Sequence, residues 1–362
     1  MKMSICIPTY NRAKIVYQAV RDCLKNEEIE IEIIVCDNCS KDDTEAVLQK
    51  VTDKRFFYYR NRTNIGFENL VKVLTYATGD YILLLSDEDT VKWGELKEII
   101  SILETREPAI LKGGANIQGR TYVKHRNGTY KAGFNAIRVF GAGDSYMSGY
   151  IFNNIILRKV IGNKKNISIK DRFGYFYCFA NLSIEMLQYG DLCFVENVIT
   201  DQVRQGKTDK NAIFNKGEAY FLVDGRMQAI QERIDVMSRT KLNEEDKFIM
   251  LQYYIERGII GGYIGVYKEM YDEDALSRME DIFRDKFMSA RSNMSREDHV
   301  SCFNEQYEKI IKHIDNCNLF GIPFHELEKK YFDTSQGYES LKEKLVSKFK
   351  EQVDLYLKDY CI

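Results

Sequence analysis

Three acidic residues stand side by side directly after an apolar segment. The stretch 81–90 reads YILLLSDEDT, so a run of apolar residues leads into Asp87, Glu88 and Asp89. Adjacent carboxylates repel one another, and such a cluster is costly at the end of a buried strand unless a cation is present. These residue types indicate a divalent-cation site, and a solvated acidic turn is the alternative interpretation.

Polar residues also follow other apolar segments within the first ninety residues. The segments 4–7, 31–36 and 56–59 are followed by Thr9-Tyr10-Asn11-Arg12, by Asp37-Asn38, and by Asn64 with Gly66. Helical patterns separate the segments, which predicts a parallel sheet with helices on both faces. Ligands bind beyond the carboxyl ends of the strands in such a sheet. We therefore expect these polar groups to form one site.

The periodicity of the chain changes twice. Alternating strands and helices fill the first hundred residues, and a looser pattern with glycine turns follows to about residue 210. Amphipathic helical patterns dominate beyond about residue 215, where Asn243 and Ser295 have the surroundings of helix N-caps. The 362 residues are long enough for two domains, and the predicted boundary separates residues 1–210 from 211–362.

Composition excludes several classes of protein. The net charge is −2, so no overall basic field indicates a nucleic-acid partner. No apolar run approaches the ~20 residues of a membrane span, and the first ten residues lack a signal-peptide core, so we expect a cytoplasmic protein with reduced thiols. Cys36 and Cys39 form a C-x-x-C without a second pair, which favours a strand-to-loop passage over a zinc or redox site.

Four motifs together resemble the family 2 glycosyltransferases, which have the GT-A fold. The motifs are Ile5-Cys-Ile-Pro-Thr-Tyr-Asn-Arg12, Val35-Cys-Asp-Asn-Cys-Ser-Lys-Asp42, Asn64-Ile-Gly66 and Gly79-Asp-Tyr-Ile-Leu-Leu-Leu-Ser-Asp-Glu-Asp89. The resemblance is specific over residues 3–90 and extends to about residue 205. It implies an α/β fold with a Rossmann-like, mixed and mostly parallel sheet, helices on both faces, and an all-helical C-terminal domain outside the resemblance. The nucleotide-binding half would span about 1–105 and the acceptor half about 106–210.

The resemblance also implies a nucleotide-sugar donor, Mn²⁺ or Mg²⁺, and inversion at the anomeric carbon. Asp89 would bind the metal together with Asp87, and the metal would stabilise the diphosphate leaving group. Asp37 would accept a hydrogen bond from uracil N3–H, which implies a UDP-sugar; an Asx cap on the following helix is the alternative role. The remaining donor contacts would come from Pro8, Thr9, Tyr10, Arg12, Asn64, Gly66, Asp87 and Glu88.

The acceptor half is less clear, although residues 141–153 resemble the segment that walls the acceptor side. Inverting transfer needs a general base, which many family members supply from a Glu-Asp pair about a dozen residues before a helix-ending glycine. Counting back from Gly190 reaches Tyr177-Cys178-Phe179, which contains no acid. Asp171, expected to be partly desolvated, is the first candidate for the base and Asp144 the second. The alternative interpretation for each is an ordinary acidic residue in a loop.

The last helical stretch carries an apolar stripe at 341, 345, 349, 353 and 356 or 357. The stretch has nearly as many acidic residues as lysines. This near balance of charge favours packing within the helical domain or against a second subunit over contact with membrane lipid.

The predicted function is metal-dependent, inverting transfer of a sugar to a glycan or lipid-linked acceptor in surface polysaccharide synthesis. One alternative is a nucleotidyltransferase, but the loop after the first strand lacks the glycine-rich basic sequence of that class. The other alternative is a noncatalytic scaffold, with which the missing Glu-Asp pair is consistent.

Overall fold

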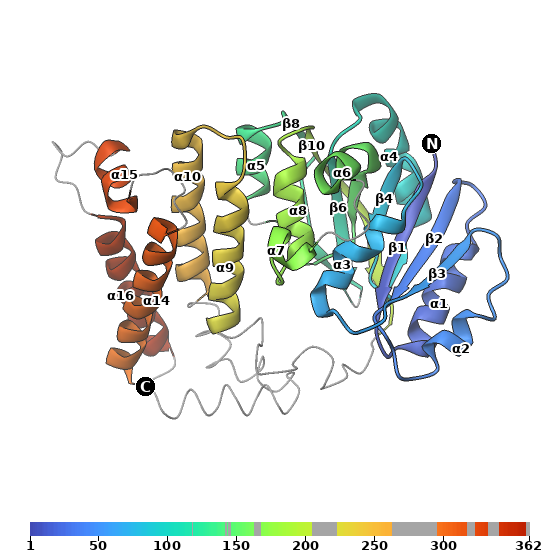
Figure 1. The fold of residues 1–362 in the computed structure, drawn as a ribbon, viewed down its shortest axis with the longest axis horizontal. Helices are drawn as coiled ribbons and strands as arrows, with labels where there is room; N and C mark the ends of the chain where they lie inside the picture. Colours follow the sequence, from blue (N-terminus) through green and yellow to red (C-terminus); the bar gives the residue numbers. More distant parts are fainter. Residues whose placement is uncertain are drawn as a thin grey trace. The chain divides into compact units, whose positions relative to one another are not determined.

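The chain forms two compact units, Met1–Lys216 and Gly217–Ile362. The computed structural model describes residues 1–117, 119–141, 143, 146–162, 168–204, 223–262, 295–316, 323–331 and 340–359. The first unit contains a mixed sheet with helices, and the second unit is helical in its described residues (Figure 1). Asp144 lies outside the described residues.

The first strands of the sheet run parallel in the order β3-β2-β1-β4. They are β1 (Met3–Thr9), β2 (Ile31–Asp37), β3 (Phe56–Arg60) and β4 (Tyr81–Leu84). Ile5 of β1 is in register with Ile33 of β2 and with Leu83 of β4. Every residue of β1, β2 and β4 is buried, which explains why these strands read as continuous apolar runs.

Helices α1 (Ala13–Leu24), α2 (Thr44–Leu48) and α4 (Trp93–Arg106) supply apolar side chains to the core formed with these strands. The helical pattern between β3 and β4, over residues 67–77, predicts one helix, and this prediction is wrong in detail. The segment instead forms a 3₁₀ turn η1 (Gly66–Glu68), one turn of α-helix α3 (Asn69–Lys72) and a second 3₁₀ turn η2 (Val73–Tyr76). The side chain of Asn69 donates to the carbonyl of Cys36 in β2, so this segment is tied to the sheet by its polar face as well as by its apolar one.

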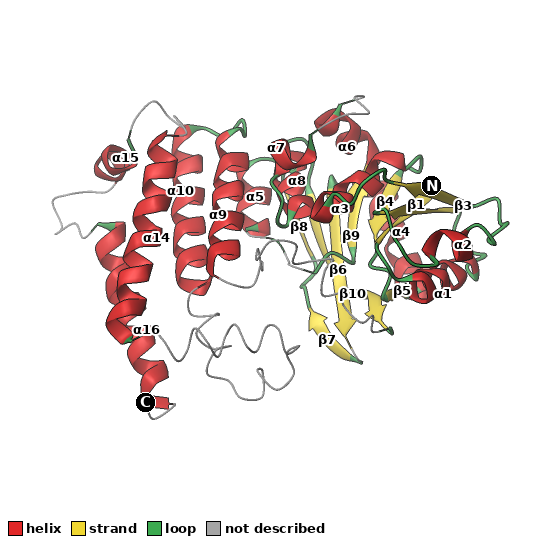
Figure 2. Cartoon of the chain, turned by 60° about the horizontal axis from the view of Figure 1, so that its bottom comes forward, coloured by secondary structure: helices red, strands yellow, loops and turns green. Residues whose placement is uncertain are grey.

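The same sheet continues from β4 with β9, β6, β10 and β5 in that order. The remaining strands are β5 (Asp89–Val91), β6 (Ile110–Ile117), β7 (Arg120–Val123), β8 (Gly128–Tyr130), β9 (Tyr150–Asn153) and β10 (Leu192–Gln202). β6 and β10 are parallel, whereas β9 and β5 pair antiparallel with their neighbours. β7 pairs with β6 and β8 pairs with β10 beside the main path, and Figure 2 shows β7 next to β6 and β10.

Short helices accompany these strands in the acceptor half. They are α5 (Phe134–Phe140), α6 (Asn154–Ile161), α7 (Ile169–Phe173) and α8 (Cys178–Met186). Every residue of α8 is buried, so this helix forms part of the interior and not a solvated surface.

The second unit is built from α9 (Val223–Ser238), α10 (Glu244–Ile255), the π turn η3 (Glu256–Ile260), α14 (Arg296–Asn316), α15 (Phe324–Tyr331) and α16 (Leu341–Asp359). Both predicted helix starts are confirmed, because Asn243 accepts from the Asp246 amide and Ser295 exchanges hydrogen bonds with Asp298.

The C-terminal apolar stripe contributes to the core of the second unit. Leu341, Leu345 and Phe349 are buried there, whereas the side chains of residues 353, 356 and 357 lie outside the described part. Among the helices of the described residues, none has the length and apolar character needed to cross a membrane.

Candidate functional site

The acidic turn joins β4 to β5 at the carboxyl end of the parallel strands. The Thr9 hydroxyl donates to Asp87 at 2.7 Å, and the Arg12 guanidinium donates to the other Asp87 oxygen at 2.9 Å. The same Arg12 nitrogen lies 3.0 Å from Glu88, which also accepts from Gln202. Two of these carboxylates, those of Asp87 and Glu88, therefore have partners within the chain, although the sequence pattern indicated only a cation or solvent for them. Arg12, 75 positions away from Asp87, supplies positive charge to the turn.

Asp89 begins β5 and is completely buried. The Tyr146 hydroxyl lies 2.7 Å from each of its carboxylate oxygens, and Arg204 donates to its backbone carbonyl. Burial raises the pKa of Asp89 to about 6; the charges of Glu88 and Asp87 act in the same direction, and hydrogen bonds from Ser148 and Tyr146 oppose them. Burial is thus the main reason that the charged form of Asp89 is disfavoured.

The acidic turn suits a divalent cation of the hard, oxygen-binding kind. Within the described residues, no three acidic, histidine or cysteine side chains are arranged to enclose a metal by themselves. Mg²⁺ in nucleotide sites is usually held by one or two carboxylates together with substrate phosphates and water, so a full protein cage is not required. Asp87 and Asp89 provide two carboxylates on one turn, and the raised pKa of Asp89 shows that added positive charge would be favourable there.

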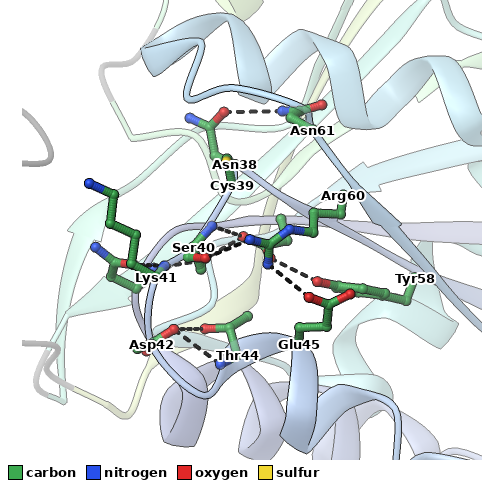
Figure 3. Close-up of polar contacts among 12 residues, drawn as sticks. Asn38, Cys39, Ser40, Lys41, Asp42, Thr44, Glu45, Tyr58, Arg60 and Asn61 are labelled. Atoms are coloured by element: carbon green, nitrogen blue, oxygen red, sulfur yellow. Dashed lines mark hydrogen bonds and ion pairs between the residues drawn. The ribbon is translucent and has the colours of Figure 1, made fainter.

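Asp37 ends β2 and is fully buried. Figure 3 shows three residues that bind it, Ser40, Tyr58 and Arg60. One carboxylate oxygen accepts from the amide and the hydroxyl of Ser40, and the other accepts from Tyr58 at 2.8 Å and Arg60 at 3.0 Å. Arg60 also contacts Glu45 and donates to the Ser40 carbonyl. A carboxylate accepts about four hydrogen bonds, so the expected bond from a uracil base has no acceptor position left on Asp37.

Asn38, the next residue, organises the loop that follows β3. Its side-chain oxygen accepts from the Ile65 amide and from Asn61, and its nitrogen donates to Asn64 and to the Gly66 carbonyl. This side chain therefore ties the end of β2 to the Asn64–Gly66 loop through both of its polar atoms.

A cavity of about 230 Å³ opens beside these loops. Its lining combines aromatic and apolar side chains, amides, and the charged pair Arg12 and Asp87; the residues are Pro8, Thr9, Tyr10, Arg12, Asn38, Asn64, Gly66, Phe67, Asn69, Leu70, Ser86, Asp87, Met147 and Tyr175. Gly66 has φ +60°, and a Cβ there would collide with the Tyr175 hydroxyl. Glycine thus satisfies both the backbone and the close contact.

Most of the residues that the sequence predicted to bind the nucleotide-sugar donor line this cavity. Pro8, Thr9, Tyr10, Arg12, Asn64, Gly66 and Asp87 line it, whereas Asp37, Glu88 and Asp89 do not. Sequence reasoning did not assign Asn38, although it follows a buried strand like the polar residues that were assigned. It also missed Phe67, Met147 and Tyr175, which have no local signal of function.

The acceptor half departs from expectation at Asp171. This residue lies in the first turn of α7, where its amide donates to the N-cap hydroxyl of Ser168, and its side chain is exposed. The expectation that Asp171 is partly buried, as suits a general base, is therefore wrong. Asp171 also does not line the cavity. Tyr177, at the position where an acid was sought, is the N-cap of α8 in the left-handed backbone conformation.

Residues 146–149 also contact the acidic turn. Besides the bond from Tyr146 to Asp89, the Ser148 hydroxyl accepts from the Ser86 amide at 2.9 Å. The fully buried Lys112 of β6 donates to the Ser148 carbonyl at 2.7 Å and lies over the ring of Tyr150. Lys112 therefore helps to hold this segment against the turn.

Comparison with known proteins identifies the first unit. Residues 4–176 match the profile of glycosyl transferase family 2. An uncharacterized glycosyltransferase of Mycoplasma genitalium is 31% identical over 112 residues, which are 29% of this chain and 36% of that protein. The UDP-Glc:alpha-D-GlcNAc-diphosphoundecaprenol beta-1,3-glucosyltransferase WfaP of Escherichia coli is 21% identical over 263 residues, 71% of this chain and 94% of that one.

Solved structures show the same architecture. Residues 1–349 of Staphylococcus aureus TarS in complex with UDP-GlcNAc have a TM-score of 0.55 at 14% identity, covering 99% of this chain and 92% of that one. Residues 4–176 therefore form a region of the glycosyl transferase family 2 type, and the first unit has the GT-A fold, as the sequence motifs predicted. The chain spans about a third of the length of the first curated relatives that it matches.

Proposed function

We propose that the chain transfers a sugar from a nucleoside-diphosphate donor to a glycan or lipid-linked acceptor in surface polysaccharide synthesis. One observation carries this proposal: the cavity at the carboxyl ends of β1, β2 and β4 is lined by residues of the motifs that resemble family 2, among them Arg12 and Asp87. The acceptor class is inferred from WfaP, whose name specifies a diphosphoundecaprenol-linked acceptor.

We propose a UDP-sugar as the donor. The TarS complex contains UDP-GlcNAc, and the name of WfaP specifies UDP-Glc. The cavity offers the rings of Tyr10 and Phe67 for contact with a base, and the side chain of Asn64 for its polar edge. The Asn64 oxygen already accepts from Asn38 and from the Gly66 amide, so its nitrogen would donate to a uracil carbonyl. Asp37 supports the loop that carries this wall and does not contact the base.

Arg12 and Thr9 would contact the phosphates of the nucleotide-sugar donor. The Arg12 guanidinium lies at the cavity wall and is already bound to Asp87 and Glu88, so it can present a charged donor to phosphate while remaining anchored. Asp89 and Asp87 would hold Mn²⁺ or Mg²⁺, which would neutralise the diphosphate as it leaves.

The general base is proposed among Asp144 and Asp171, and the exposed position of Asp171 favours Asp144 of the two. Such a base would take the proton of the acceptor hydroxyl as that hydroxyl attacks the anomeric carbon from the face opposite the diphosphate, which gives inversion.

Calorimetric titration with UDP, GDP, CDP and dTDP, with and without Mn²⁺, tests the donor proposal. We expect UDP to bind most tightly and its affinity to rise with Mn²⁺. Release of UDP from UDP-glucose and UDP-GlcNAc in the presence of Mn²⁺ then tests catalysis. A chain that binds none of the nucleotides and turns over neither sugar nucleotide would be a noncatalytic scaffold, and the proposal would fail.

A further inference from the structure

A long segment of the acceptor half contains no acidic residue. Positions 108–143, between Glu107 and Asp144, lack Asp and Glu, although the chain as a whole has 54 acids in 362 residues. The same 36 positions contain Lys112, Arg120, Lys124, Arg126, Lys131 and Arg138. Since the net charge of the chain is −2, this basic segment is a local feature and not a reflection of overall composition.

Three of these cations lie together on β7 and the loop that follows it. Arg120, Lys124 and Arg126 are exposed, and in the described part of the chain none of them forms an ion pair with an acid. Lys112 is buried and Lys131 pairs with Asp191. We call Arg120, Lys124 and Arg126 the basic hairpin. Exposed cations without local acids create a positive potential at the surface.

Arg120 of the basic hairpin lies on the same face of the sheet as Asp89 of the acidic turn. Asp89 is in register with Gln202, Gln202 with Ile117, and Ile117 with Arg120. Residues in register on neighbouring strands point to the same side, so the row runs from the turn to the hairpin on one face. Three strand spacings of about 4.8 Å separate its ends, which places the Arg120 backbone about 14 Å from that of Asp89.

Aromatic contacts connect the two ends of this row. Tyr122, two residues after Arg120 and 61% exposed, packs edge-on against Tyr146 with ring centroids 5.8 Å apart. Tyr146 in turn donates to Asp89. On the other side of the hairpin, the His125 ring stacks on Phe194 of β10 at 4.3 Å. The cations are thus carried by a hairpin anchored to the sheet, beside the proposed reaction centre.

We propose that the basic hairpin binds a phosphate group of the acceptor, so that the chain selects acceptors that carry phosphate near the hydroxyl to be glycosylated. This inference rests on the proposed function for the identity of the reacting site. Arginine and lysine are the side chains that recognise phosphate through charge-assisted hydrogen bonds. Two acids near the hairpin and the turn are Glu88, which Arg12 and Gln202 bind, and Glu196 of β10, whose amide donates to Asn127 next to Arg126. Neither pairs with the hairpin.

The test compares the triple variant Arg120→Gln, Lys124→Gln, Arg126→Gln with the matched control Arg21→Gln, Lys50→Gln, Lys54→Gln, which removes three exposed cations elsewhere in the same unit. The probe is a fluorescent glycerol-phosphate oligomer, titrated by anisotropy at low salt with saturating UDP and Mn²⁺ to fill the donor site. We expect the hairpin variant to weaken oligomer binding by about tenfold or more, and the control variant and UDP affinity to remain near the intact values.

Other outcomes overturn the inference. Equal weakening by the control variant would assign the binding to general charge, and unchanged binding by the hairpin variant would remove the hairpin from recognition. Vesicles of phosphatidylglycerol in phosphatidylcholine form a separate arm: loss of vesicle binding alone, with oligomer binding intact, would assign the hairpin to the membrane surface. Failure of the intact chain to bind UDP would refute the proposed function, whereas the oligomer titration without UDP would still measure the hairpin.

Discussion

The hydroxyl of Tyr146 lies 2.7 Å from both carboxylate oxygens of Asp89. A single phenol therefore occupies the carboxylate that the sequence assigned to a metal, and it does so from the acceptor half of the same unit. Any cation that binds Asp89 must share this carboxylate with Tyr146 or displace it. The following predictions begin from this contact.

Tyr146→Phe should lower the free energy of unfolding of the metal-free protein by about 1.5–3 kcal/mol, the usual effect of losing a hydrogen bond to a charged group. Added Mn²⁺ should recover part of the loss, because the cation compensates the same carboxylate. Thermal unfolding with and without Mn²⁺ measures both effects. Tyr122→Phe is the control, since it removes a hydroxyl from an exposed neighbouring ring. Equal stability of Tyr146→Phe and the intact protein would contradict the prediction.

Asp89→Asn should abolish the Mn²⁺-dependent part of UDP binding while the protein remains folded. The amide keeps the shape of the side chain but loses the charge that attracts a cation. Calorimetry with UDP in Mn²⁺ and in EDTA gives the comparison, and Glu196→Gln, an exposed acid on β10, is the control. If EDTA leaves UDP affinity and sugar transfer of the intact protein unchanged, the acidic turn is not a metal site.

Asp37→Asn should destabilise the first unit by about 2–4 kcal/mol, because Arg60 and the other donors around a buried carboxylate lose their charged acceptor. Preference for UDP over CDP should not change in the folded fraction. Glu45→Gln alters the half-exposed partner of the same Arg60, and its effect should stay within about 0.5 kcal/mol. Urea unfolding and nucleotide titration are the measurements. A stable variant that no longer distinguishes the two nucleotides would return base recognition to Asp37.

Glu32 gives the stability of the protein an acid-sensitive component. Burial alone would raise its pKa, but hydrogen bonds from Lys2, Ser4 and Thr78 outweigh burial and lower the pKa from 4.5 to about 2. A carboxyl group whose pKa is lowered on folding stabilises the folded state at pH values above its unfolded pKa of 4.5. This contribution disappears as the pH falls from 4.5 toward 2.

Glu32→Gln should therefore cost about 2–3 kcal/mol near pH 7. Its difference from the intact protein should shrink as the pH falls toward 2. Urea unfolding between pH 2.5 and pH 7 follows this difference, and the exposed Glu30→Gln serves as the control. A difference that is the same at every pH would show that shape and not charge makes Glu32 important.

Asp144→Asn should lower the rate of sugar transfer by ~10²–10⁴ and leave UDP affinity unchanged, as loss of a general base does. Asp171→Asn is the matched variant, and its exposed side chain predicts a transfer rate close to that of the intact protein. Steady-state transfer and UDP titration on both variants separate the two residues. The reverse pattern, with Asp171→Asn slow and Asp144→Asn normal, would assign the base to Asp171.

The sequence was informative where local pattern and long-range structure agree. Continuous apolar runs predicted β1, β2 and β4 because both faces of these strands are covered, and Asn243 and Ser295 marked helix starts because capping is a contact between near neighbours. The partners of Asp87 and Asp89 were not predictable in this way. Arg12 and Tyr146 lie 75 and 57 positions from the acids that they bind, and no periodicity reports such distances.

Asp37 shows a second limit of the sequence. Its position after β2 predicted a polar group at the end of the strand, and the structure has one there. Whether that group faces the ligand or the protein depends on Tyr58 and Arg60 of the neighbouring strand. Asn38, one residue further, lines the cavity instead.

The hydrogen bonds of Asn38 to Ile65, Asn61, Asn64 and Gly66 have a kinetic consequence. They hold the nucleotide wall of the cavity in place before any ligand arrives, so binding needs little ordering of the backbone. Association with a nucleotide is then governed by diffusion and charge, and differences in affinity among nucleotides appear in how long each one stays bound. Under the proposed function, the chain would select its donor by residence time.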